Sequence, residues 1–347
     1  MERDKSIDVM KGILIVLVVM AHAQGPGYRF IYLFHMATFF MISGYLWKTR
    51  SNLSKDSVFI RRKIKSLYFP YVICNGAFLL IFLLLPSIFD VAMCEKTWGV
   101  IEEIIKILLL DGRCSMPGAT WFVAILFEIN ILCYLIEWGA YKVSGKKYQY
   151  SFAFRSIAAI VLLCNGYLLM RFRVNYMQIG TLCSAYAIFH LGNIMKVIES
   201  RNANVLNNHR RLFGVLSVGV LVCLLAYNTQ EIRLINNQII NPYYYLTAAC
   251  SGWFMIRALA FILIDNCMLI SRIFVYIGKK SMYILCCHLL SFKIVAVLQC
   301  MVNKDFSGIA NHPVAFAGGM WWILYTVAGI TVPIMGAIIV DKIREFS

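Results

Sequence analysis

Lys11 and His22 lie eleven positions apart in the apolar segment KGILIVLVVMAH near the start of the chain. Eleven residues of α-helix turn through about 1100°, which is three turns plus ~20°, and rise about 16 Å. Both side chains therefore belong to one face of a helix. An imidazole is suited to take a proton from an alcohol, and a cation suits a phosphorylated cosubstrate at the far end of a thin acyl-carrying arm. The same spacing also fits a snorkelling lysine and a histidine hydrogen-bonded between helices.

A second imidazole follows within a short distance along the chain. His35 opens the segment FHMATFFMISGY, and only the short stretch QGPGYRF separates this segment from the end of the first helix. We therefore expect His22 and His35 to lie at similar depth and to be able to share a cavity, although a purely structural role for His35 remains open. Ser43 and Gly44 are small residues that allow neighbouring helices to approach closely.

Further ionisable and aromatic residues lie inside later apolar segments. TWFVAILFEINI places Trp121 near one end of a predicted span and Glu128 near its middle, and GKKSMYILCCHLL places His288 about two helical turns after Ser281. A carboxylate at mid-membrane depth is costly unless it is paired or protonated, so Glu128 is a candidate for function. An ion pair or hydrogen bond that holds two helices together is the alternative. Arg257 is a further cation that can simply mark the end of its span.

The elements that position these residues are predicted to be membrane helices. Hydrophobic residues make up 61% of the 347 and charged residues 14%, which is far below the share of about a quarter in soluble domains. Apolar runs of about 20 residues, long enough to cross the hydrocarbon core, recur along the whole chain. The sequence predicts one all-α integral membrane domain over 1–347, a bundle of about ten transmembrane helices, because lipid requires every backbone group to be satisfied internally. We place the spans near 7–25, 30–47, 68–89, 119–138, 153–170, 178–196, 212–228, 243–264, 281–300 and 318–340.

The net charge of +16 is explained by the distribution of the basic residues rather than by nucleic-acid binding. The alternate loops 48–67, 139–155, 196–211 and 265–280 and the two termini hold most of the Lys and Arg, which predicts cytoplasmic termini and contact with anionic lipids. The stretch 48–67 is expected to lie on the membrane surface, and 90–118 is expected to include a short interfacial helix. The twelve cysteines show no metal-binding spacing, so we expect no metal, and Cys94 and Cys114 are a candidate disulfide.

Taken together, these segments resemble the acyltransferase-3 family of membrane acyltransferases, and most closely its fucose 4-O-acetylase-like branch. RDKSIDVMKGILIVLVVMAH is similar to the family's first helix, in which ten residues separate a basic residue from a histidine, and it includes Asp8 three residues before the cation. FHMATFFMISGY resembles the second-helix signature, although Ala37-Thr38 replaces the Pro-Leu often found there. RRKIKSLYFPY, TWFVAILFEINIL and YIGKKSMYILCCHLL resemble later landmarks, whereas residues ~150–255 match only in hydropathy and are where we expect acceptor choice to be made.

The resemblance implies an O-acyltransferase of the plasma (inner) membrane that uses an acyl-CoA, most often acetyl-CoA. The expected acceptor is a hydroxyl of a surface polysaccharide sugar or of a lipid-linked glycan precursor. His22 would act as general base or, less favourably, as a transient acyl carrier, and His35 or Glu128 would orient it. Lys11, with Arg61 and Arg62, would meet the CoA phosphates, while Asp8, Ser43, Trp121 and His288 would line or support the site.

A transporter or flippase for a polysaccharide precursor is the main alternative, and a glycan polymerase is a second one. No internal repeat is detected and only seven prolines are present, which disfavours a transporter. A polymerase is expected to have a longer outer loop rich in Arg, and the loop 90–118 does not fit that pattern. The sequence leaves open the acceptor sugar and hydroxyl, the acyl length, the membrane face of the acceptor and the oligomeric state.

Overall fold

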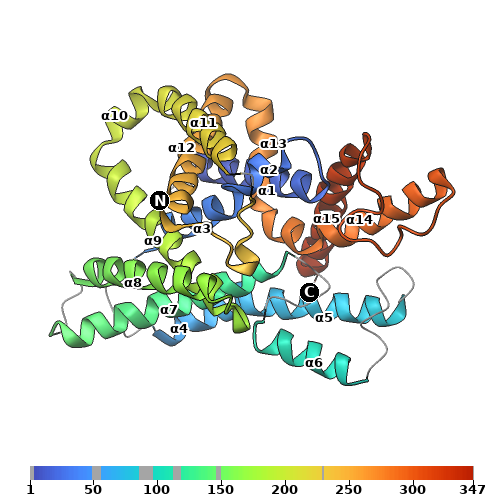
Figure 1. The fold of residues 1–347 in the computed structure, drawn as a ribbon, viewed down its shortest axis with the longest axis horizontal. Coiled ribbons are helices and arrows are strands. Elements are labelled where there is room, and N and C mark those ends of the chain that lie inside the picture. The colour runs from blue at the N-terminus through green and yellow to red at the C-terminus, as the bar shows by residue number, and fades with distance from the viewer. Residues whose placement is uncertain are drawn as a thin grey trace.

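The computed structural model describes residues 4–48, 56–85, 97–111, 119–145, 150–228 and 230–346. Within these ranges the chain is a helical assembly without strands, as the hydropathy predicts (Figure 1). The main helices are α1 (Lys5–His22), α2 (Tyr28–Tyr32), α3 (His35–Tyr45), α4 (Asp56–Lys63), α5 (Phe69–Leu84), α6 (Thr97–Leu108), α7 (Trp121–Val143), α8 (Ser151–Arg171), α9 (Ile179–Arg201), α10 (Ala203–Asn208), α11 (Arg210–Tyr227), α12 (Pro242–Asn266), α13 (Met268–Lys279), α14 (Ser281–Asn303) and α15 (Trp321–Phe346).

Eight helical segments in the described part of the chain are long and apolar enough to cross a membrane. The first two of the ten expected spans are not among them. α1 has only 18 residues and carries Lys5, Asp8 and Lys11, and the expected span 30–47 is broken after Tyr32 into α2 and α3. α3 has only 11 residues, or about 16 Å of helix, which is about half of the hydrocarbon thickness.

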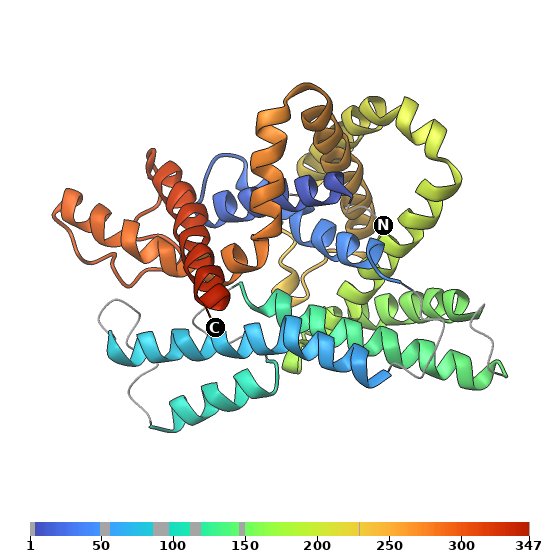
Figure 2. The ribbon, with the colours of Figure 1, turned by 180° about the vertical axis from the view of Figure 1, so that it is seen from behind.

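α1 lies at the centre of the assembly, where it packs against α2, α3, α12, α13, α14 and α15 (Figures 1 and 2). α4 to α8 form a separate layer along one side in both views. The side chain of Asp4 caps the start of α1 by accepting a hydrogen bond from the Ser6 backbone N–H at 2.9 Å. The helix ends at His22, just before the turn Gly25-Pro26-Gly27, because proline cannot continue a helix and Gly27 adopts a φ of +76°. This end point fixes the position of His22.

Two pairs of glycines bring helices into direct backbone contact. A Cβ added at Gly12 would lie 2.1 Å from the Phe274 carbonyl oxygen, and one at Gly278 would lie 1.9 Å from that of Asp8, so α1 and α13 touch through both glycines. Gly44 and Gly192 make the equivalent contact between α3 and α9. In lipid there is no hydrophobic driving force between helices, so close backbone approach at small residues stabilises their packing instead. The expectation that Gly44 allows a neighbouring helix to approach is thus confirmed.

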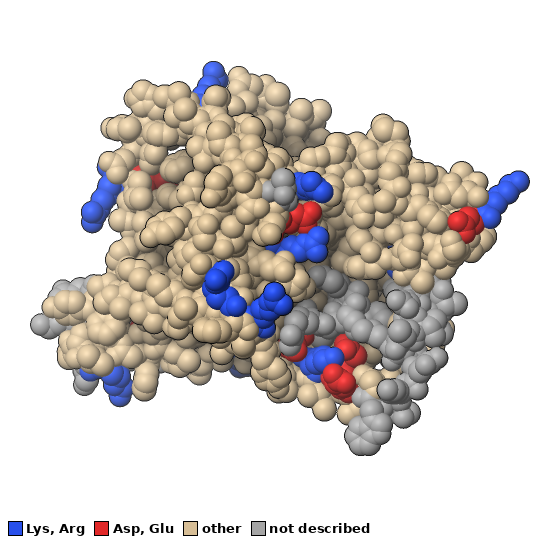
Figure 3. Space-filling model, in the orientation of Figure 1, with Lys and Arg blue, Asp and Glu red and all other residues tan. Residues whose placement is uncertain are grey.

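Of the two predicted surface segments, the first differs from expectation and the second is helical as expected. The basic stretch 48–67 does not form a separate surface helix over its described part, because α4 continues through a π-helical turn at Ile64–Tyr68 directly into α5. The predicted interfacial helix is α6, which packs beside α5. The candidate disulfide partners Cys94 and Cys114 lie outside the described residues. The surface facing the viewer in Figure 3 is mostly uncharged, with Lys, Arg, Asp and Glu confined to small groups, as expected where lipid surrounds the helices.

Candidate active site

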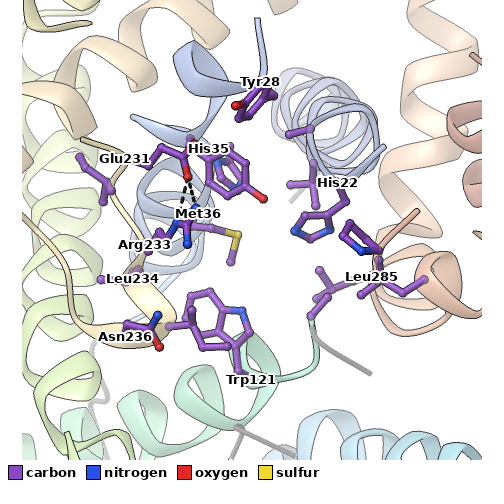
Figure 4. A pocket seen from close by; sticks show the side chains of 18 of the residues that line it. His22, Tyr28, His35, Met36, Trp121, Glu231, Arg233, Leu234, Asn236 and Leu285 are labelled. Carbon is purple, nitrogen blue, oxygen red and sulfur yellow. Dashed lines mark hydrogen bonds and ion pairs between the residues drawn. The ribbon is translucent and has the colours of Figure 1, made fainter. Parts of the chain in front are cut away.

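A large cavity of about 550 Å³ is bordered by the end of α1. His22 extends into it from α1, His35 lines it from the first turn of α3, and Trp121 lines it from the first turn of α7 (Figure 4). The expectation that His22 and His35 share a cavity is therefore met, and Trp121 joins them there. A volume of this size is in the range typical of small-molecule sites.

His22 is hydrogen-bonded to a second imidazole, and that imidazole is His288. The His22 Nδ1 and His288 Nε2 atoms are 2.9 Å apart, and the two ring planes differ by only 7°. His288 is fully buried in α14, and its Nδ1 lies 2.8 Å from the Ile284 carbonyl oxygen and 3.1 Å from that of Leu285. Two residues 266 positions apart in the chain are thus linked at one point.

These contacts determine where the protons of the neutral pair reside. A carbonyl oxygen can only accept, so the His288 Nδ1 must carry a proton and donate it to the backbone. The Nε2 of neutral His288 then has no proton and accepts one from the Nδ1 of His22. The remaining nitrogen of His22, Nε2, is left with an unprotonated lone pair. A base of this form is what proton removal from an alcohol requires.

His35 has a different hydrogen-bond partner. Its Nδ1 lies 2.8 Å from the carbonyl oxygen of Ile31 at the broken start of the second predicted span, so this nitrogen also donates to backbone. The Tyr32 ring lies close to both imidazoles, with its centroid 6.3 Å from that of His22 and 5.1 Å from that of His35. His35 therefore borders the cavity without contacting His22 directly.

A second, smaller cavity of about 160 Å³ follows the same face of α1 toward Lys11. This small space, called the slot below, is lined by Lys11 and Ser43 together with mostly apolar side chains. Leu285 lines both the slot and the large cavity, so the two spaces adjoin beside α14. The remaining residues that line the slot are Ile15, Phe39, Ile42, Phe122, Leu126, Ser281 and Met282.

The other predicted site residues lie elsewhere. Glu128 is half-buried on α7 and lines neither the slot nor the large cavity. Within the described structure the residue hydrogen-bonded to His22 is therefore His288, and not Glu128 or His35.

The predicted charged residues also lie apart from this histidine pair. Arg61 and Arg62 are exposed on α4 and line an open groove separate from Lys11. Asp8 is buried in the first turn of α1. Arg257 forms ion pairs with Glu199 and Asp4 at another cavity.

Two loops complete the large cavity, and sequence reasoning did not find them. Glu231 and Arg233 come from the segment before α12, and His312 comes from the loop between α14 and α15. Lys293 holds that loop by donating hydrogen bonds to the carbonyl oxygens of Ile309 and Asn311, at 3.0 and 2.9 Å. The protein atoms that replace water around His312, and then the Lys293 ammonium, lower the pKa of His312, so its imidazole is neutral near pH 7.

Comparison with known protein families shows to which family the chain belongs. The acyltransferase domain family matches residues 4–340, which is nearly the whole chain. The chain belongs to the acyltransferase-3 family. It is a multi-pass membrane acyltransferase, and the transporter and polymerase alternatives are disfavoured accordingly. No curated protein and no solved structure matches the chain. Among the described residues of this acyltransferase, no cluster of three or more His, Cys, Asp or Glu side chains is suited to hold a metal ion.

Proposed function

We propose that this acyltransferase transfers an acetyl group from acetyl-CoA to a hydroxyl of a surface polysaccharide sugar or of a lipid-linked glycan precursor, at the plasma membrane. The proposal includes the fucose 4-O-acetylase-like assignment suggested by the sequence. The main support is that His22, which is hydrogen-bonded to His288, borders the large cavity, and that this cavity adjoins a smaller space lined by Lys11.

The slot is suited to the donor. Its walls are apolar and its volume is small, which fits a thin flexible chain better than a sugar ring. Lys11 at its end supplies a cation for a phosphate of the CoA, because charge-assisted contacts to phosphate are strong. On the predicted orientation of the helices, Lys11 is at the cytoplasmic side, where acetyl-CoA is available.

The large cavity beside His22 is suited to the acceptor. The loops that border it, between α1 and α2, before α12 and between α14 and α15, all belong to the side predicted to face outward. In the transfer step, the Nε2 of His22 removes the hydroxyl proton while the sugar oxygen attacks the thioester carbonyl. The new C–O bond forms and the C–S bond breaks, and the CoA sulfur leaves with the proton that His22 has taken up. His288 holds His22 in the required tautomer throughout and accepts its Nδ1–H.

Mass spectrometry of surface glycans tests this function. Cells that lack the protein are complemented with the wild-type chain or with His22→Ala, and membrane insertion of both is verified. Wild-type complementation is expected to add the mass of an acetyl group to a glycan sugar, whereas His22→Ala leaves the glycan unmodified. A glycan unchanged by the wild-type protein would contradict the proposed acceptor, and full acetylation by His22→Ala would contradict the proposed base.

A further inference from the structure

One wall of the large cavity carries a charged pair that proton transfer does not use. Glu231 and Arg233 line the cavity opposite His22, as Figure 4 shows. The Nε and Nη2 atoms of Arg233 both lie 2.9 Å from the same oxygen of Glu231, Oε2. In the described structure no hydrogen bond is made to the Glu231 Oε1 or by the Arg233 Nη1. The pair therefore offers one acceptor and one donor to a ligand.

The segment that bears this pair is held rigidly. The Arg233 N–H donates to the Gln238 carbonyl oxygen and the Gln238 N–H donates to that of Arg233, both at 3.1 Å, so the chain turns back on itself. The Thr181 hydroxyl of α9 donates to the Leu234 carbonyl oxygen at 2.8 Å. The turn is thereby fixed to α9.

A buried asparagine fixes the same turn a second time. Asn237 adopts a φ of +55° and is fully buried. Its Nδ2 donates to the Gly166 carbonyl oxygen of α8, and its Oδ1 accepts from the Ser184 hydroxyl of α9, both at 2.7 Å. A binding wall that is ordered before the ligand arrives loses little entropy when it binds.

Aromatic rings complete the same cavity. The Trp121 indole and the Tyr28 phenol line it together with Asn236 (Figure 4). The Tyr32 phenol lines it as well. Aromatic rings offer an apolar surface beside polar edges, which suits the C–H face of a sugar ring, while the Glu–Arg pair suits its hydroxyls. Because Arg233 already neutralises Glu231, the wall carries no excess charge for an anionic sugar to pair with.

We infer that the Glu231–Arg233 pair is the recognition element for the acceptor and that it selects a neutral sugar ring with adjacent hydroxyls, one donating to Glu231 Oε1 and the next accepting from Arg233 Nη1. This inference rests on the proposed function. It places the choice of acceptor in the region of the chain where the sequence shows no family landmark.

The test uses cells that lack the protein, complemented with single variants, and measures glycan acetylation by mass spectrometry. Glu231→Gln is nearly isosteric and removes the charge, and Arg233→Gln removes the donor fork. Each is expected to lower acetylation at least about tenfold, which corresponds to the loss of a charge-assisted hydrogen bond. Glu102→Gln is the matched control, since it removes the acid of an ion pair with Lys106 on α6, away from the cavity. Its acetylation is expected to stay at the wild-type level.

The double exchange Glu231→Arg with Arg233→Glu separates recognition from a structural role. It keeps an ion pair in the turn but reverses the donor and acceptor positions, so it is expected to fail as the single variants do. Thermal unfolding of the purified proteins verifies that all variants are folded. Acetylation within twofold of wild type in both single variants, or restored by the double exchange, would overturn the inference. So would an acetyl group located on an acidic sugar. If the wild-type protein acetylates no glycan, the proposed function fails instead.

Discussion

The two spaces along α1 differ in nearly every property that determines what they can hold. The slot at Lys11 is about 160 Å³ and mostly apolar, while the large cavity at His22 is about 550 Å³ and lined by imidazoles, tyrosines and a Glu–Arg pair. A single helix face connects them, because Lys11 and His22 are separated by three turns. The difference indicates that the slot binds the chain-like donor and that the large cavity binds the ring-shaped acceptor.

The largest expected effect lies at the point where both substrates must meet. His22→Ala removes the base while leaving the slot and the wide cavity otherwise intact. General-base catalysis contributes about 10²- to 10⁴-fold, so acetyl transfer by the purified protein should fall by at least about 100-fold. Transfer of labelled acetyl at the wild-type rate would show that the base lies elsewhere.

The next effect concerns the histidine pair itself. His288→Ala removes the acceptor for the His22 Nδ1–H, so His22 can adopt the wrong tautomer, and activity should fall about 10- to 100-fold as for other residues that orient a functional imidazole. His288→Gln keeps an oxygen that can accept this proton and should retain clearly more activity. Equal loss in both variants, measured as kcat, would argue against the tautomer explanation.

A side chain that fills the slot should raise the KM for the donor acetyl-CoA more than the KM for the acceptor. Ser43→Phe places a ring in the narrow space beside Lys11. Because the slot holds only about 160 Å³, we expect the KM for acetyl-CoA to rise about tenfold or more, given that overpacking costs ~1–3 kcal/mol. Ser57→Phe on α4 is the matched control because Ser57 is exposed and lines no described cavity. An unchanged KM for acetyl-CoA in Ser43→Phe would place the donor outside the slot.

The smallest effect is expected from the cation at the end of the slot. Lys11→Gln removes one charge-assisted contact to a phosphate, for which we expect a rise in the KM for acetyl-CoA of about tenfold or less. Lys5→Gln on the same helix is the control, because Lys5 is exposed and borders neither space. The effect should shrink as salt concentration rises, since ions screen a partly exposed charge. A salt-independent loss would indicate a structural role for Lys11.

The membrane class could be predicted from the sequence, and so could the shared cavity of His22 and His35. Hydropathy determines that long apolar segments form helices in lipid, and ionisable residues inside such segments are rare enough to stand out. The break between α2 and α3 could not be predicted, because hydropathy is continuous across FIYLFHMATFF. Leu33 and Phe34 at this turn are buried, and Phe34 packs against Gly252 of α12, a contact that the sequence does not reveal.

The hydrogen-bond partner of His22 was harder to predict from the sequence than His22 itself. His288 was identified as a supporting residue, but its contact with His22 spans 266 positions and depends on how α14 packs against α1. Glu231, Arg233 and His312 belong to polar loops, where charged residues are common and do not stand out. Only the fold shows that these loops close over the same cavity.

A structure of the protein bound to a non-hydrolysable acetyl-CoA analogue tests the central claim most directly. We expect the thin arm of the CoA to lie in the slot between Lys11 and Leu285. The acyl carbonyl should then reach the His22 end of the large cavity and leave room for a hydroxyl oxygen about 3 Å from the Nε2 atom. An arm that enters by another route, or an acyl group that ends away from His22, would contradict this claim.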